Sequence, residues 1–166
     1  MHAVVPPLPR EVEADPRAAA IRARLGASAR PLWSGAALAV PDVPLEAALA
    51  RALVCAHARG DLVLGLEGCA DALMVEARGL DALAARTAAG PAERVSRLLL
   101  VADDGAERFY RQVERVSARH APRLLTCRVT ADAARLGAAV AGRQLRVKAV
   151  LVQHKRAVAA ALRALA

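Results

Sequence analysis

Two adjacent carboxylates, Asp103 and Asp104, are the side chains of this chain best placed to do chemistry, because they follow directly after the apolar run of residues 95–102. Ligands of open α/β sheets bind at the carboxyl ends of strands, so an acidic pair there could hold a magnesium ion. The same position also suits helix capping, and Glu107 would then lie favourably in the first turn of a helix beginning near Gly105. We therefore expect one of the two carboxylates to cap that helix, and a small enzyme with a site at this pair is the weakest of three functional alternatives.

The other residues that commonly do chemistry lack the spacing that metal binding or catalysis requires. Three histidines are isolated in the sequence: His57, His120 and His154. Three cysteines lack C-x-x-C spacing and are predicted to be buried, reduced thiols: Cys55, Cys69 and Cys127. The sequence has no P-loop, no G-x-S-x-G and no G-x-G-x-x-G. We therefore predict a protein that is not an enzyme, holds no metal and needs no cofactor.

The charge of the chain indicates a phosphate-rich partner. Lysine and arginine number 24 against 16 aspartates and glutamates, giving a formal net charge of +8. Such a surplus is the electrostatic signature of nucleic-acid binding, although a GC-rich genome could also raise the arginine content. Aromatic residues make up only 2% of the chain, which argues against binding through stacked bases. The sequence shows neither a signal peptide nor a run of about 18 apolar residues, so we expect a cytoplasmic protein with no membrane contact.

The second half of the chain alternates between apolar runs and amphipathic segments. Strands are predicted at residues 61–65, 95–102, 122–130 and 145–152, with helices over residues 45–60, 66–77, 105–120, 131–140 and 155–165. Continuous runs of leucine and β-branched residues are typical of strands buried on both faces, and their alternation with helices is typical of α/β folds. We predict a three-layer α/β/α sandwich around a mixed sheet of about four strands.

The first part of the chain is less regular than the second. Residues 1–43 hold most of the prolines, and we predict a partly disordered N-terminal extension with one short helix over residues 15–25. Residues 36–40 (AALAV) could form a short edge strand, and the lone Trp33 is expected to pack against the domain. The sandwich domain is expected to occupy residues 44–166, with a helical turn and a surface loop over residues 79–94.

Four motifs occur in a fixed order along the predicted domain. RGDLVLGLEGCADAL covers residues 59–73, an apolar strand with an Asp-rich turn covers residues 98–104, a Leu-Gly pair stands at 136–137, and a final strand covers residues 147–152. In this order the chain resembles the superfamily of kink-turn RNA-binding ribosomal proteins, which includes domain three of eukaryotic and archaeal release factors and of Pelota. The resemblance spans residues 45–165 and implies a non-enzymatic RNA- or ribosome-associated module.

The chain differs from the kink-turn pattern in the first turns of the second helix of the motif. Kink-turn binders carry Asn-Glu and a lysine in its first turns, whereas this chain has Glu67, Gly68 and Asp71. Two carboxylates there would repel phosphates, which argues against standard kink-turn recognition. The stretch is closer to the release-factor and Pelota form, so a protein-interaction or scaffold domain is the alternative function.

An RNA-binding face can still be built from other groups. The amino terminus of the helix over residues 66–77 offers backbone N–H groups to a phosphate, and the loop after the Leu-Gly pair supplies basic side chains that the resemblance places beside the same edge. Gly65 also suits a strand-to-helix turn that needs a permissive backbone. Structured RNA or the ribosome is the expected partner. The candidate RNA-binding residues are Arg59, Gly65, Leu66, Glu67, Arg94, Arg97, Arg143, Arg146 and Lys148.

Overall fold

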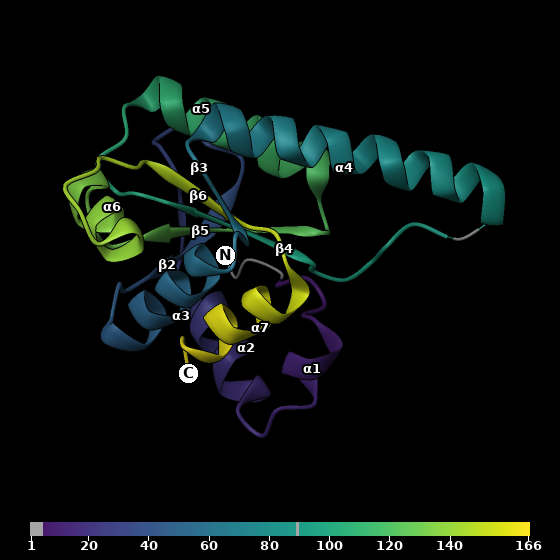
Figure 1. Cartoon of the computed structure of the whole chain (residues 1–166), viewed down its shortest axis with the longest axis horizontal. Coiled ribbons are helices and arrows are strands. Elements are labelled where there is room, and N and C mark those ends of the chain that lie inside the picture. Colours follow the sequence, from purple (N-terminus) through teal and green to yellow (C-terminus); the bar gives the residue numbers. More distant parts are fainter. Residues whose placement is uncertain (1–4, 89) are drawn as a thin grey trace.

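The computed structural model describes residues 5–88 and 90–166, which form seven helices and a six-stranded mixed sheet (Figure 1). No helix in this described part is long and apolar enough to cross a membrane. The helices are α1 (Arg10–Glu13), α2 (Ala18–Ala27), α3 (Ala47–Ala58), α4 (Leu66–Thr87), α5 (Glu107–His120), α6 (Ala133–Ala141) and α7 (Lys155–Arg163). The strands are β1 (Ala29–Pro31), β2 (Ala39–Val43), β3 (Leu62–Leu64), β4 (Arg97–Val101), β5 (Leu124–Val129) and β6 (Ala149–Val152).

The strands lie in the order β1-β2-β5-β4-β6-β3. The central strand β4 runs parallel to β5 and antiparallel to β6, and β3 runs antiparallel to β6 at the edge of the sheet. The predicted α/β class and mixed sheet are confirmed, as are the four strands in the second part of the chain. The predicted number of about four strands is wrong, because β1 and β2 add two strands from residues before position 44.

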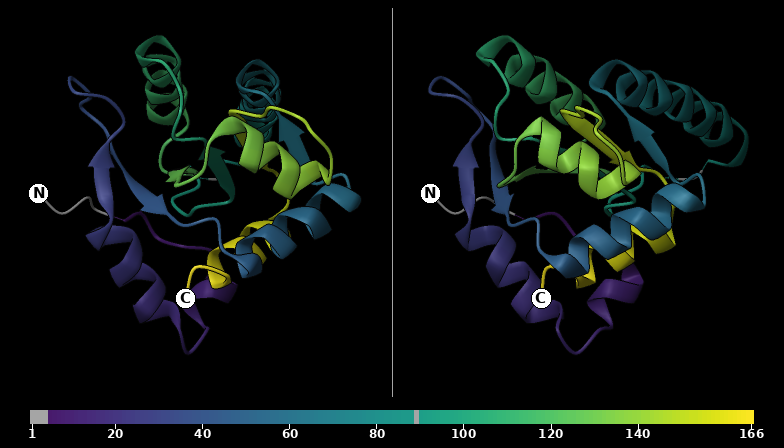
Figure 2. Two further views of the ribbon diagram at one scale, coloured as in Figure 1. Left: turned by 90° about the vertical axis from the view of Figure 1, so that its left-hand side faces the viewer. Right: turned by 60° about the vertical axis from the view of Figure 1, so that its left-hand side comes forward.

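Helices pack on both faces of the sheet, and alternate residues of each central strand point to opposite faces. Leu98 and Leu100 of β4 belong to the hydrophobic cluster formed with α1, α2, α3, α6 and α7. Leu99 and Val101 belong to the other cluster, formed with α4 and α5. The views in Figure 2 show α4 and α5 side by side on their face, with α3 and α7 on the other.

The segment that we predicted as an extension packs into the same core as the rest of the chain. Leu8, Val12, Ile21 and Leu25 are fully buried there, and β2 pairs with β5. The backbone N–H of Val95 donates to the Pro7 carbonyl over 2.8 Å, which fixes this segment beside β4. Described residues of this segment therefore contribute to the same hydrophobic core and sheet as the rest of the chain. Residues 1–4, which also fall in the predicted extension, lie outside the described residues.

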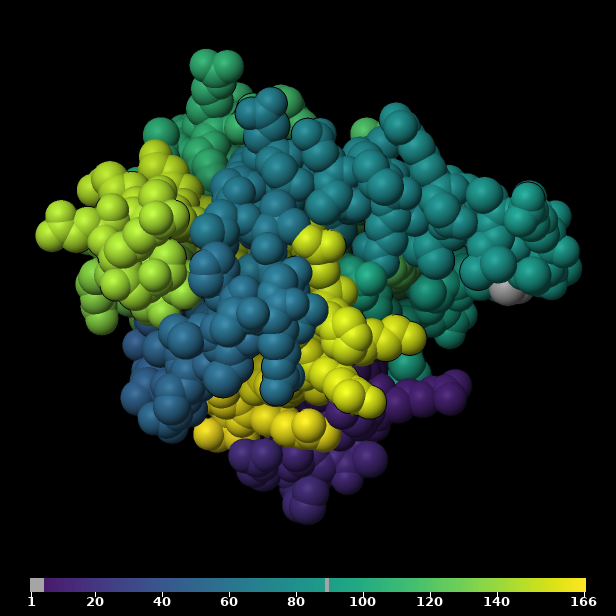
Figure 3. Space-filling model, viewed as in Figure 1, coloured from purple at the N-terminus to yellow at the C-terminus, as the bar shows by residue number. Residues whose placement is uncertain are grey.

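Helix α4 is longer than predicted and projects from the body of the molecule (Figure 3). It continues through residues 79–87, which we expected to form a turn and a loop, because the run ALAAR over residues 82–86 consists of strong helix formers. It ends at Ala88, whose φ of 50° is left-handed. Beyond its buried part the helix exposes Val75, Leu80 and Leu83.

The three cysteines do not share one environment. Cys69 and Cys127 are buried as predicted, and burial raises the pKa of each thiol to about 12. Cys55 is exposed on α3, so the prediction of burial is wrong for this residue. The buried face of α3 is formed by Leu49, Leu53 and Ala56, and Cys55 lies beside this face.

Replacing Leu8 by alanine tests whether the N-terminal segment belongs to the core. Leu8 is fully buried, so we expect Leu8→Ala to lower the free energy of unfolding by about 2–5 kcal/mol in a denaturant titration. The control is Val54→Ala, which truncates a side chain that is 46% exposed and should change stability by less than about 0.5 kcal/mol. Equal effects of the two substitutions would contradict the packing.

Candidate nucleic-acid interface

One edge of the sheet gathers most of the predicted RNA-binding residues. The register pairs Val101 at the end of β4 with Ala149 at the start of β6, and β3 also ends at this side. The backbone N–H of Gly65 donates to the Ala149 carbonyl over 2.8 Å, and that of Ala102 donates to the Lys148 carbonyl over 2.9 Å. We call this region the β4 carboxyl edge, formed by residues 65–67, 103–105 and 143–148.

The turn after β4 is held by the hydroxyl of Tyr110. This oxygen accepts a hydrogen bond from the Gly105 N–H over 3.0 Å and donates one to the Ala102 carbonyl over 2.8 Å. Tyr110 is buried, and burial raises the pKa of its hydroxyl, which therefore stays a donor at neutral pH. The buried tyrosine thus fixes where the Asp103–Asp104 pair emerges from the sheet.

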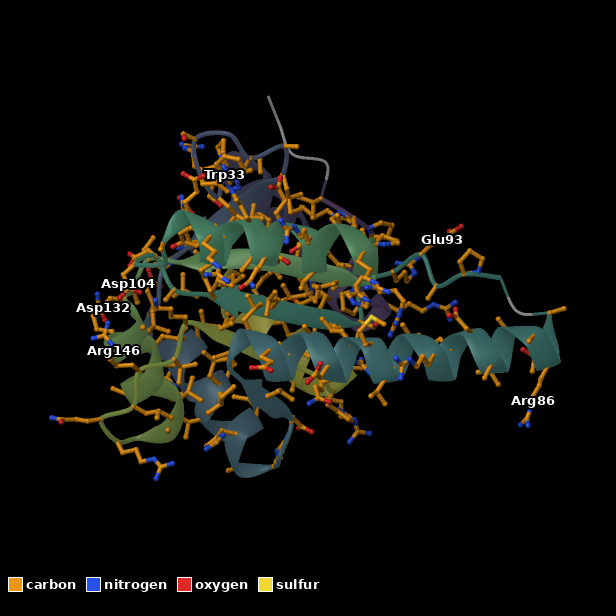
Figure 4. All side chains as sticks on the ribbon, turned by 90° about the horizontal axis from the view of Figure 1, so that it is seen from above. Trp33, Arg86, Glu93, Asp104, Asp132 and Arg146 are labelled. Carbon is orange, nitrogen blue, oxygen red and sulfur yellow. The ribbon has the colours of Figure 1, made fainter. Side chains whose placement is uncertain are left out.

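The acidic pair has a different structural role from the one predicted. Asp104 accepts a hydrogen bond from the Ala133 N–H over 2.9 Å, so it caps α6 and not α5. Helix α5 begins after Ala106 without a side-chain cap. Asp104 also pairs with Arg146 over 3.4 Å, and Figure 4 shows both side chains near Asp132. Asp104 therefore joins the turn after β4 to α6 and to the basic loop.

The basic loop is held against α6 by a glycine. A Cβ atom on Gly137 would lie 1.5 Å from the Leu145 carbonyl oxygen, so only glycine permits this approach. The N–H of Val147 donates to the Ala133 carbonyl over 2.9 Å and adds a second attachment. The Leu-Gly pair of the predicted motif therefore positions the loop that carries Arg143, Arg146 and Lys148.

Gly65 forms the turn between β3 and α4. Its φ of 87° lies in the region that other residues rarely adopt, whereas the space around its Cα is open. The glycine is therefore required by the backbone and not by crowding. It places Leu66 and Glu67 in the first turn of α4, at the β4 carboxyl edge.

Three predicted site residues lie away from this edge. Arg97 begins β4 at the opposite end of the sheet, where it pairs with Glu76, and burial lowers the pKa of its guanidinium. Arg94 donates to the Leu8 carbonyl over 3.1 Å, and Arg59 follows α3 at the start of β3. The structure therefore does not bring these three arginines together with the loop. Arg59 and Arg97 lie near the starts of β3 and β4, whereas the β4 carboxyl edge lies at the ends of these strands.

Helix α5 carries basic residues that we did not predict as a site. Arg108, Arg111, Arg115 and Arg119 follow one another at intervals of three or four residues, so they share one face of the helix. We call them the arginine row. All four are exposed. The spacing of these arginines is visible in the sequence. That they form one exposed surface follows only from the structure, in which the opposite face of α5 is buried.

The acidic residues of α5 leave much of this row unneutralised. Glu114 accepts hydrogen bonds from the Trp33 indole N–H over 3.2 Å and from the Leu38 N–H over 2.8 Å. Glu107 pairs with Arg111, whose guanidinium also lies 4.6 Å from the centre of the Trp33 ring. Within the described residues, the other three arginines of the row form no ion pair.

The arginine row begins at the β4 carboxyl edge. The Lys148 ammonium lies 5.9 Å from the centre of the Phe109 ring, in the first turn of α5. A basic surface therefore runs from the loop of residues 143–148 along α5. Carboxylates flank it, because Glu67 and Asp103 lie at the same edge and Asp132 lies near Asp104 and Arg146. Among residues 5–88 and 90–166, no group of three or more metal-binding side chains comes together.

No protein-family model and no curated protein matches the chain. The resemblance to the kink-turn and release-factor superfamily therefore stays a prediction drawn from the motifs. The contacts at Gly65, at the turn after β4 and at Gly137 do not depend on that prediction.

Replacing Gly137 by alanine tests whether this glycine positions the basic loop. The added methyl group collides with backbone, so we expect Gly137→Ala to destabilise the fold by about 1–3 kcal/mol and to shift the backbone amide signals of residues 143–148 in NMR spectra. Gly79→Ala is the matched control, because its Cβ meets open space on α4 and should stabilise the fold by about 0.5–1 kcal/mol. Unchanged loop signals in Gly137→Ala would show that the contact does not position the loop.

Proposed function

We propose that the protein is a non-enzymatic, cytoplasmic RNA- or ribosome-associated module that binds through phosphate contacts and shape. The observation that carries the proposal is the arginine row on α5 and its continuation to Lys148. In this proposal α5 belongs to the outer layer of a three-layer α/β/α arrangement and presents the row to the partner. The net charge of +8 supports the same conclusion.

The dimensions of the row suit a nucleic-acid strand. Arg108 and Arg119 are separated by eleven residues of helix, which corresponds to about 16 Å. Phosphates recur about every 3.4 Å along the axis of one strand of duplex DNA, so on that scale a row of this length spans about five phosphates. Each guanidinium can bind a phosphate through two parallel hydrogen bonds, which makes arginine well suited to this contact.

The carboxylates of the β4 carboxyl edge restrict where the RNA can lie. Glu67 and Asp103 are both exposed, and both would repel a phosphate placed at the amino terminus of α4. The proposed path therefore follows α5 and reaches the edge at Lys148, and it does not cross the turn at Gly65. Binding of this kind reads the backbone and the shape of the RNA, not the base sequence.

A triple substitution in the arginine row tests the proposal. Arg108→Gln, Arg115→Gln and Arg119→Gln together remove three of the proposed phosphate contacts. Each contact contributes about 0.7 in a single strand and about 0.9 in a duplex to the slope of log K against log salt, so we expect the slope for a structured RNA to fall in magnitude by about 2 to 3. The measurement is a fluorescence-anisotropy titration at several salt concentrations.

The control variant removes the same number of charges from other surfaces. Arg51, Arg59 and Arg156 are exposed on α3, after α3 and on α7, and their replacement by glutamine should leave most of the salt dependence in place. An equal loss in both variants would show that only net charge matters. An absence of RNA binding by the unmodified protein at low salt would contradict the proposal.

The alternative function, a protein-interaction domain, is favoured by the projecting part of α4. Leu80 and Leu83 in this part are 37% and 52% exposed, and Val75, which precedes it on the same helix, is 67% exposed; such exposure is unusual for large apolar side chains on one helix. A protein contact made there would persist at raised salt, whereas phosphate binding would weaken. The same salt series therefore separates the two functions, and Leu80→Ser with Leu83→Ser would affect only the protein contact.

A further inference from the structure

A cavity of about 290 Å³ lies between the N-terminal segment, β2, the second half of α5 and the start of β5. Most of its lining is apolar and includes Val5, Pro6, Leu38, Val40 and Leu124. The cavity involves neither the arginine row nor the β4 carboxyl edge, since it lies at the opposite end of β5. It is therefore a feature that the proposed RNA contact does not use.

Two buried hydroxyl groups give this apolar cavity a polar position. Ser117 and Thr126 both line it and are only 5% and 4% exposed. The Ser117 Oγ and Thr126 Oγ1 atoms are 2.6 Å apart and share one hydrogen bond. The two hydroxyl groups together have two hydrogens to donate, and the bond between them uses one. Among the described residues, these two side-chain hydroxyls make no other hydrogen bond. One buried hydroxyl hydrogen is therefore left to be accepted by something else.

We infer that the cavity binds a neutral, mostly apolar small molecule with one carbonyl or ether oxygen. The oxygen accepts the remaining hydrogen of the Ser117–Thr126 pair, and the apolar body fills the space against Leu38, Val40 and Leu124. The described residues that line the cavity include no charged side chain, so a charged ligand would lose its hydration without gaining a partner.

The volume of the cavity limits the size of the ligand. A cavity of about 150 Å³ lined by apolar side chains holds one benzene molecule, so this one suits a molecule of about two fused rings. Bicyclic ketones fulfil both requirements, because they combine an apolar body of this size with a single strong acceptor.

The inference is tested with 1-tetralone and with tetralin, which has the same two rings without the oxygen. Binding to the full chain is followed by saturation-transfer NMR and by shifts of the amide signals around residues 117–126. We expect 1-tetralone to bind at least about ten-fold more tightly than tetralin, which corresponds to about 1.4 kcal/mol. Equal affinities for the two molecules, or no binding of either, would overturn the inference.

Two variants locate the binding. Ser117→Ala with Thr126→Val removes both hydroxyls and should reduce the affinity for 1-tetralone to that for tetralin. Ala118→Phe places a large side chain at an exposed helix position that lines the cavity, so it should abolish binding of both molecules even if the double variant does not fold. Unchanged binding in Ala118→Phe would place the molecule elsewhere and contradict the inference. The arginine-row triple variant should bind 1-tetralone normally.

Discussion

The antiparallel course of β6 between β4 and β3 is the constraint on which the proposed interface depends. Since β6 begins where β4 ends, the loop before β6 must lie beside the turn after β4. Since β3 also runs antiparallel to β6, its exit at Gly65 reaches the same edge. Three segments from distant parts of the sequence are thereby brought together by backbone pairing alone, before any side chain contributes.

Side chains then fix these segments in position. The Tyr110 hydroxyl bonds both sides of the turn after β4, and Asp104 extends from that turn to the first N–H of α6. Gly137 lets the loop backbone lie directly on α6. Because the same α5 that supplies Tyr110 to the core carries the arginine row on its outer face, burial of one face determines where the basic face points.

The sequence predicted the parts of the fold that are encoded locally. The apolar runs that became β3, β4, β5 and β6 were identified because each is a short apolar segment next to an amphipathic helix. A short edge strand over residues 36–40 was considered, which overlaps β2, but the place of β2 between β1 and β5 was not predicted. Its pairing with β5 joins residues far apart in the sequence, in a segment where prolines suggested disorder. The capping role of Asp104 was assigned to the wrong helix for the same reason, since α6 lies 29 positions further along the chain.

The candidate site was predicted in part. The basic residues of the loop and Gly65 lie at one edge of the sheet, whereas Arg59, Arg94 and Arg97 do not. The sequence shows that a residue is close to a strand, but it does not show which strand ends lie together in the folded sheet. Figure 4 shows Arg146 at one end of the molecule and Arg86, near the tip of the projecting helix α4, at the other. The arginine row was missed because no local motif marks it.

The electrostatics of the edge decide between two paths for a bound RNA. Carboxylates at Glu67 and Asp103 disfavour the path over the amino terminus of α4, and the arginine row favours the path along α5. The most direct measurement is photo-crosslinking of the protein to a structured RNA containing 4-thiouridine, followed by mass spectrometry of the crosslinked peptides. The account predicts crosslinks in residues 107–120 and 143–148. Crosslinks confined to residues 51–59 and 155–163, on the other face of the sheet, would contradict it.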